Sequence, residues 1–171
     1  MRKYQNRKFS NSIKLLIPLS STIILTLLFL SPNSFSFWSY MTPSITMCCV
    51  YYWLINRPEN FDLASVYIIG ALEDLLSTTP LGVNIITLLV IYIIISNQEK
   101  FFYRKTFDVT WWSFSIVAAI SFVIKWVIIS IYYQKAIPVD LMILSYCMTF
   151  VLYPIIAMIN NYLKEKFLSE I

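Results

Sequence analysis

Three charged side chains within the apolar runs stand out as able to do chemistry, Glu73, Asp74 and Lys125, and Asp140 is expected at the outer interface together with Asp74. Paired carboxylates support aspartyl catalysis only where they face each other across a water-filled site. Asp74 and Asp140 stand in no recognisable catalytic motif, and the chain has no histidine, the usual general base and metal ligand. The three cysteines lie in apolar runs without metal-site spacing. The sequence therefore predicts no enzyme, no cofactor and no metal site.

Composition indicates what surrounds these groups. The chain has 171 residues, of which 58% are hydrophobic and 13% are charged. A soluble domain usually carries about 25% charged residues, because it has a wet surface to cover. The sequence therefore predicts an all-α membrane protein in which residues 1–171 form one integral membrane domain.

The apolar runs predict a compact bundle of about six transmembrane helices, since each crossing needs about 20 apolar residues. The expected helices cover about 13–30, 35–55, 61–77, 81–96, 109–133 and 139–162. The first is expected to be retained rather than cleaved as a signal, because no small-x-small cleavage site follows it. Pro43 is expected to break the second helix and Pro154 to interrupt the sixth. The aromatic residues 51–53 end the second helix, as is typical of the headgroup level.

The positions of the basic residues predict the orientation. With the N-terminus inside, 11 of the 13 Lys and Arg residues lie on inside segments, while Lys135 lies outside and Lys125 lies within a span. The positive-inside rule then favours six crossings with both termini cytoplasmic, since five would put the basic C-terminal tail outside. These residues are expected to meet anionic membrane lipid. No nucleic-acid partner is predicted.

Charges within spans normally face a bundle interior or a cavity. Asp74 lies about one helical turn from the outer end of its helix, and Lys125 lies about two turns, roughly 10 Å, from the outer end of its own. We hypothesise that Lys125 pairs with Asp74 or Glu73. The alternative is that Lys125 snorkels independently to the headgroups.

The residues around Asp74 also predict a tight helical hairpin. Gly70 and Asp74 are four apart and share a helical face. Gly70 indicates close approach of a neighbouring backbone, and Pro80 and Gly82 predict a sharp turn into the next helix. The simpler interpretation of these residues is packing and turn formation without a ligand.

At these residues the sequence resembles a known family, the rod shape-determining membrane protein MreD. Chain length, topology and the basic N-terminus agree across essentially the whole chain, and the informative motif covers about Trp53–Tyr92. The family's signature is close to G-x-x-x-D-x-x-x-x-x-P-L-G. The residues that carry the resemblance are Tyr52, Trp53, Arg57, Pro58, Gly70, Asp74, Pro80, Leu81, Gly82 and Tyr92. Two departures are Thr78-Thr79, where the family often has a glycine, and Glu73 beside the motif aspartate.

The resemblance implies a non-enzymatic component of the bacterial elongation (rod) complex in the inner membrane. Such proteins support lateral peptidoglycan synthesis and maintain cell shape. The partners it implies are the scaffold MreC, the actin-like MreB, and RodA with the elongation-specific penicillin-binding protein.

The resemblance also implies a fold similar to the substrate-binding subunits of energy-coupling-factor vitamin transporters, with a cavity open to the outer side near Asp74. The alternative function is therefore that of such a transporter subunit. Those subunits typically carry a small-x-x-x-small seam on the first helix, whereas Ile13–Leu30 contains no alanine or glycine.

Overall fold

The computed structural model describes residues 17–29, 43–77, 79–98, 106–135 and 138–168. Within these ranges the chain forms six α-helices and a short 3-10 helix and contains no strand, so the all-α prediction is confirmed. The elements are the helix Ile17–Phe29, α2 Ile45–Asn56, η1 Pro58–Asn60, α3 Leu63–Leu76, α4 Val83–Ser96, α6 Phe107–Tyr133 and α7 Val139–Leu168. The parts of the expected helices at 13–16 and 35–42, and the basic residues at 2–14 and 100–105, lie outside the described residues.

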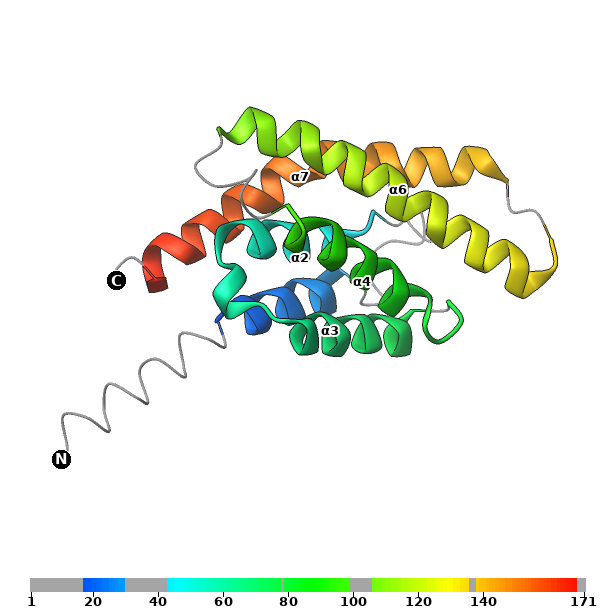
Figure 1. Ribbon diagram of the computed structural model, residues 1–171, viewed down its shortest axis with the longest axis horizontal. Coiled ribbons are helices and arrows are strands. Elements are labelled where there is room, and N and C mark those ends of the chain that lie inside the picture. Colours follow the sequence, from blue (N-terminus) through cyan, green and yellow to red (C-terminus); the bar gives the residue numbers. More distant parts are fainter. Residues whose placement is uncertain (1–16, 30–42, 78, 99–105, 136–137, 169–171) are drawn as a thin grey trace.

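The centre of the bundle is α2, which the other helices surround (Figure 1). Ten consecutive residues, Ile45–Leu54, are buried, as expected for a helix that is apolar on all sides. The indole N–H of Trp53 donates to Ser21 Oγ at 3.1 Å, and the Tyr52 hydroxyl donates to Asn161 Oδ1 at 3.1 Å. These aromatic side chains therefore point into the bundle. The sequence predicted that they would lie at the lipid headgroups, and that prediction is wrong. Their polar atoms find partners on neighbouring helices, which is what allows their burial.

An aromatic cluster joins α2 to the two long helices. The rings of Phe114 and Tyr153 stack with centroids 4.2 Å apart, and Tyr51 meets both edge-on at 5.0 and 5.6 Å. Offset and edge-to-face aromatic pairs contribute about 0.5–1.5 kcal/mol each beyond their buried area. The cluster fixes α6 and α7 against the central helix.

The start of α3 is fixed by a side-chain cap. Asp62 Oδ1 accepts hydrogen bonds from the amide of Ser65 at 3.0 Å and from its hydroxyl at 2.8 Å. These bonds hold the pKa of the Asp62 carboxyl below its usual range, because they favour the ionised form. The cap satisfies a backbone N–H that has no partner within the helix.

Pro154 lies inside α7, which continues through it from Val139 to Leu168, so the expected interruption is wrong. A proline removes the hydrogen bond to the carbonyl four residues earlier, which here belongs to Phe150. That carbonyl accepts a hydrogen bond from the indole N–H of Trp111 in α6 at 3.3 Å, and the two rings stack at 5.1 Å. The neighbouring helix thus replaces the bond that the proline removes.

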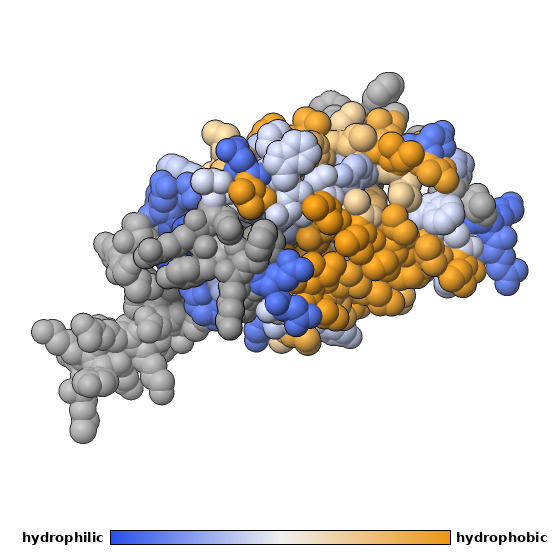
Figure 2. Space-filling model, turned by 45° about the horizontal axis from the view of Figure 1, so that its top comes forward, coloured by the Kyte–Doolittle hydropathy of each residue, from blue (hydrophilic) through white to orange (hydrophobic). Residues whose placement is uncertain are grey.

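The outer surface of the long helices is apolar. Phe107–Tyr133 and Val139–Lys166 are long and apolar enough to cross a membrane, and only 28% and 22% of their most apolar stretches is buried inside the protein. Trp112 and Ile131 are 67% and 72% exposed. A broad apolar area covers the face shown in Figure 2. The exposed apolar face indicates a membrane protein, because the core helices of a soluble protein would be covered.

We expect Trp111→Phe to destabilise the protein by about 1–3 kcal/mol, because the Phe150 carbonyl loses its donor in an apolar environment. In a Pro154→Ala background the alanine N–H serves that carbonyl, so the same substitution should cost clearly less. Unfolding in detergent of the four proteins of this double-mutant cycle measures the difference. Equal costs in both backgrounds would show that Trp111 does not compensate for Pro154.

Candidate functional site

The most connected polar group in the bundle is the carboxylate of Asp74, near the end of α3. It accepts backbone N–H groups of Gly82 at 2.7 Å, Asn84 at 2.9 Å and Ile85 at 3.4 Å, all at the start of α4. Gly82 is the N-cap residue of α4 and has no side chain that could cap it. Asp74 therefore supplies from α3 the N-terminal cap of the next helix, and its negative charge faces the positive end of the α4 dipole.

The two glycines of the chain make this arrangement possible for different reasons. Gly82 has a φ of +99°, in the left-handed region that favours glycine. Gly70 lies where α3 and α4 pack most closely, since a Cβ added there would approach the Ile85 Cα to 2.8 Å. Gly70 and Asp74, one turn apart, thus hold the first turn of α4 by backbone contact and by hydrogen bonds.

Asn84 connects this hairpin to α6. Its Nδ2 donates to Ser77 Oγ at 3.3 Å and to Thr79 Oγ1 at 3.1 Å, while its Oδ1 accepts from Lys125 Nζ at 2.7 Å. Among the described residues no salt bridge joins Lys125 to Glu73 or Asp74. The structure therefore links Lys125 to Asp74 through Asn84. The backbone N–H of Asn84 donates to the Asp74 carboxylate, and its side-chain oxygen accepts from Lys125. A direct ion pair stays a prediction.

Glu73 lies on the interior side of the same hairpin and is only 6% exposed. Its carboxyl group lies near Thr46 of α2 and near Lys125 of α6. The Thr46 hydroxyl in turn contacts that of Thr26 at 3.1 Å. We call Glu73, Asp74, Asn84 and Lys125 the hairpin cluster. Contacts from this cluster and the two threonines reach five helices.

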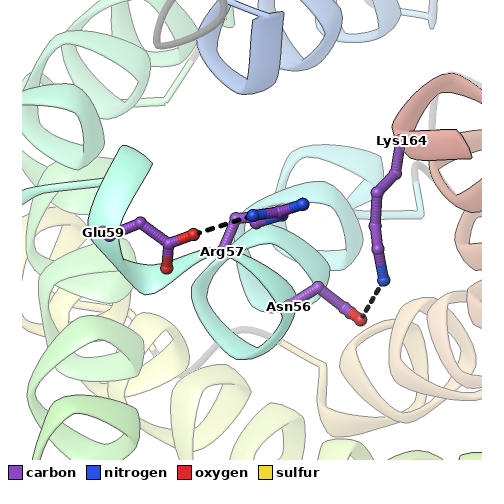
Figure 3. A network of polar contacts seen from close by, with 4 residues as sticks. All are labelled: Asn56, Arg57, Glu59 and Lys164. Atoms are coloured by element: carbon purple, nitrogen blue, oxygen red, sulfur yellow. Dashed lines mark hydrogen bonds and ion pairs between the residues drawn. The ribbon is translucent and has the colours of Figure 1, made fainter. Parts of the chain in front are cut away.

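The remaining motif residues do not join this cluster. Trp53 is buried against Ser21, whereas Arg57 and Pro58 lie where α2 ends and η1 begins, at the opposite end of the bundle (Figure 1). The Arg57 guanidinium forms a salt bridge with Glu59 at 3.2 Å (Figure 3). In the turn before α4, the Pro80 carbonyl accepts from Val83 N at 3.3 Å, and Leu81 is 77% exposed.

The contacts of Asp74 described above stabilise the fold. All three of the Asp74 contacts given above are to backbone amides, and Asp140 lies exposed in the first turn of α7. Within the described residues no group of three metal-ligating side chains is found. A small hollow of about 10 Å³ lies between the helix Ile17–Phe29 and α3. It is lined by Ile23, Thr26, Leu27, Ile69, Leu72 and Leu76, and none of the hairpin cluster lines it.

Comparison with known proteins decides the family. The family described as rod shape-determining protein MreD matches residues 10–163, nearly the whole chain. The chain belongs to the MreD family. No curated protein and no solved structure matches it significantly. MreD proteins are generally non-catalytic membrane proteins that determine rod shape, which agrees with a site built from helix caps and packing contacts.

The MreD motif gains a physical explanation from this geometry. Three motif residues shape the N-terminus of α4: Gly70, Asp74 and Gly82. Gly70 and Asp74 are one turn of α3 apart, and Gly82 lies in the turn that leads into α4. Sequence reasoning missed Asn84, which is 3% exposed and contacts both the turn and α6. A polar amide at the start of an apolar run was the available signal.

We expect Gly70→Ala to destabilise this MreD protein more than Gly82→Ala. The first forces a Cβ against the Ile85 backbone, an overpacking cost of about 1–3 kcal/mol. The second meets no atom within 4 Å and only loses about 1 kcal/mol to left-handed strain. Thermal unfolding of both variants in the same detergent gives the order. The reverse order would contradict the close approach of α3 and α4.

We also expect Asn84 and Lys125 to be energetically linked. Asn84→Leu and Lys125→Met should each destabilise the protein, and the double variant should lose about 0.5–3 kcal/mol less than the sum. The measurement is a double-mutant cycle of unfolding free energies. A parallel cycle of Lys125→Met with Ser96→Ala, at the far end of α4, is the control and should be additive. If the losses of unfolding free energy are additive in both cycles, Asn84 and Lys125 are not linked, and Lys125 extends to the headgroups independently.

Proposed function

We propose that this MreD protein is a non-enzymatic component of the elongation (rod) complex in the bacterial inner membrane. In this role it supports lateral peptidoglycan synthesis and so maintains cell shape. The observation that carries the proposal is the family match over residues 10–163, together with the glycine and aspartate motif that shapes the α3–α4 hairpin.

The proposed topology is a bundle of six crossings with both termini in the cytoplasm. Two helices have the full length of a span, and three shorter apolar helices accompany them. Basic residues support the orientation. The C-terminal ends of α2 and α7 lie at one end of the bundle and the C-terminal end of α6 lies at the other (Figure 1). In sequence Arg57 follows α2 and Lys164 and Lys166 are in the last turns of α7, whereas Lys135 follows α6. In this orientation the end of the bundle that carries the α3–α4 turn faces the outer side of the membrane.

The proposed partners are MreC, MreB, RodA and the elongation-specific penicillin-binding protein. A rigid bundle fits this role, because an assembly protein must present its surfaces in a fixed arrangement. The hairpin cluster and the aromatic cluster around Tyr153 together tie α2, α3, α4, α6 and α7. Large apolar side chains are exposed on α3, α6 and α7, where they can contact lipid or partner helices.

The test is depletion of the protein in its own host, with cell shape and the site of new wall incorporation as readouts. We expect rods to round up and dispersed lateral incorporation to be lost. Re-expression of the natural chain should restore both. Unchanged rods together with a new vitamin requirement would instead favour a transporter subunit.

Variants sharpen the same experiment. Asp74→Ala and Gly82→Leu should restore shape poorly, because each disturbs the first turn of α4, whereas Lys135→Gln at the same end should restore it fully. Immunoblotting of membrane fractions separates low protein levels from loss of function. Normal rods from both hairpin variants at normal levels would count against a role for this motif.

A further inference from the structure

The C-terminal part of α7 is joined to α2 by polar side chains. The three pairs, with donor–acceptor distances of 3.6, 3.1 and 3.2 Å, are Asn160–Cys49, Asn161–Tyr52 and Lys164–Asn56. Figure 3 shows the last of them. We call residues 160–168 of α7 the arm. Along the described part of α7 the hydrophobic core ends at Ala157, so hydrogen bonds more than buried apolar surface hold the arm.

A proline lies less than two turns before the arm. Pro154 has no N–H to give to the Phe150 carbonyl, and the indole N–H of Trp111 in α6 donates to that carbonyl instead, at 3.3 Å. Helices bend most readily where their ladder of backbone hydrogen bonds is interrupted. Because Trp111 holds the carbonyl before the proline, the segment after the proline can turn while the segment before it stays in place.

The segment of α7 before Pro154 is held differently. Thr149 Oγ1 accepts the backbone N–H of Ser44 at 3.0 Å, and its carbonyl lies 3.7 Å from Cys48 Sγ. Tyr153 belongs to the aromatic cluster that fixes α6 and α7 against α2. Aromatic packing and a buried threonine therefore secure α7 before the proline, whereas polar side-chain pairs secure it after the proline.

The closed position of the arm leaves one buried polar atom unpaired. Asn160 is 0% exposed, and no donor within the described residues reaches its Oδ1. A buried oxygen without a hydrogen bond destabilises the arrangement that buries it, because it has lost its bonds to water. Movement of the arm away from α2 would let water reach this oxygen. The same contact thus contains bonds that hold the arm and a group that favours its release.

We propose that the arm is a conformational device that turns about Pro154, away from α2 and back, while the rest of the bundle stays folded. In the closed position it covers Cys49 and holds the Tyr52 hydroxyl, and in the open position it uncovers this part of α2. Local opening of this kind occurs where few buried apolar contacts oppose it. In Figure 1 the arm is the red end of α7, which extends past α2.

The device does not depend on the proposed function. A role in the rod complex could fail while the arm still opens, and the arm could stay closed while cells still require the protein for shape. The proposed orientation adds only the side of the membrane, which would be the cytoplasmic one.

Two neighbouring cysteines report on the two sides of Pro154. Cys48 and Cys49 are both 0% exposed, but Cys49 contacts the arm through Asn160, whereas Cys48 contacts Thr149 before the proline. The test is modification of the full-length protein in a neutral detergent by N-ethylmaleimide, read by peptide mass spectrometry. Cys48→Ala isolates Cys49, and Cys49→Ala isolates Cys48. We expect Cys49 to react about fivefold faster or more, since the opening exposes it alone.

Two substitutions in the Cys48→Ala background should move the Cys49 rate in opposite directions. Asn161→Leu removes the acceptor of the Tyr52 hydroxyl and should raise the rate about two- to tenfold, as expected for one lost hydrogen bond. Pro154→Ala allows a continuous backbone ladder and should lower the rate about twofold or more. Thermal unfolding shows whether each variant folds. If Asn161→Leu does not fold, Lys164→Met, which removes the bond to Asn56, decides.

The matched control is Ser115→Ala, which removes a hydroxyl that lies 2.6 Å from the Tyr146 hydroxyl on the segment before the proline. It should leave the Cys49 rate within about twofold, because the arm makes no contact there. Equal rates at Cys48 and Cys49 would overturn the device, since both would then react through opening of the whole bundle. An unchanged Cys49 rate in Pro154→Ala would overturn the hinge.

Discussion

The first turn of a buried helix must find partners for its backbone N–H groups, and in this protein Asp74 provides them for α4. Its carboxylate accepts three backbone N–H groups from a helix eight or more residues further along the chain. Asp74 and Asn84 are each only 3% exposed, so water has little access to replace these bonds, and the cap has greater weight than on a wet surface. The α3–α4 hairpin, the position of Asn84 and hence the position of Lys125 all depend on it.

The same requirement explains other features that look unrelated in sequence. The carbonyl released by Pro154 is served by Trp111, and the buried indole of Trp53 is served by Ser21. In each case a polar group that cannot reach water is paired across two helices. The contacts that pack the helices together therefore also provide the hydrogen bonds that buried polar groups need. Aromatic side chains with a polar atom make several of these contacts.

Much of this fold could be predicted from the sequence, because apolar runs, proline, glycine and basic residues report directly on helices, turns and topology. Gly70 pointed to a close backbone approach, although only the structure names Ile85 as its neighbour. Two interpretations failed for one reason. Pro154 was expected to break its helix and Tyr52 and Trp53 to face headgroups, yet each has a partner from a distant helix. Local patterns carry no information about such partners.

The unequal lengths of the helices have a further consequence. The 14 residues of α3 and of α4 rise about 21 Å, whereas the 27 residues of α6 rise about 40 Å, and a bilayer has a hydrocarbon core of about 30 Å. No membrane of uniform thickness matches both sides of this molecule. In the proposed topology, where all three helices cross the bilayer, we expect lipid to thin beside the short hairpin and to thicken beside α6, unless α6 tilts. In that topology we expect the bilayer to be deformed asymmetrically, with neighbours that have short hydrophobic segments on one flank and those with long ones on the other.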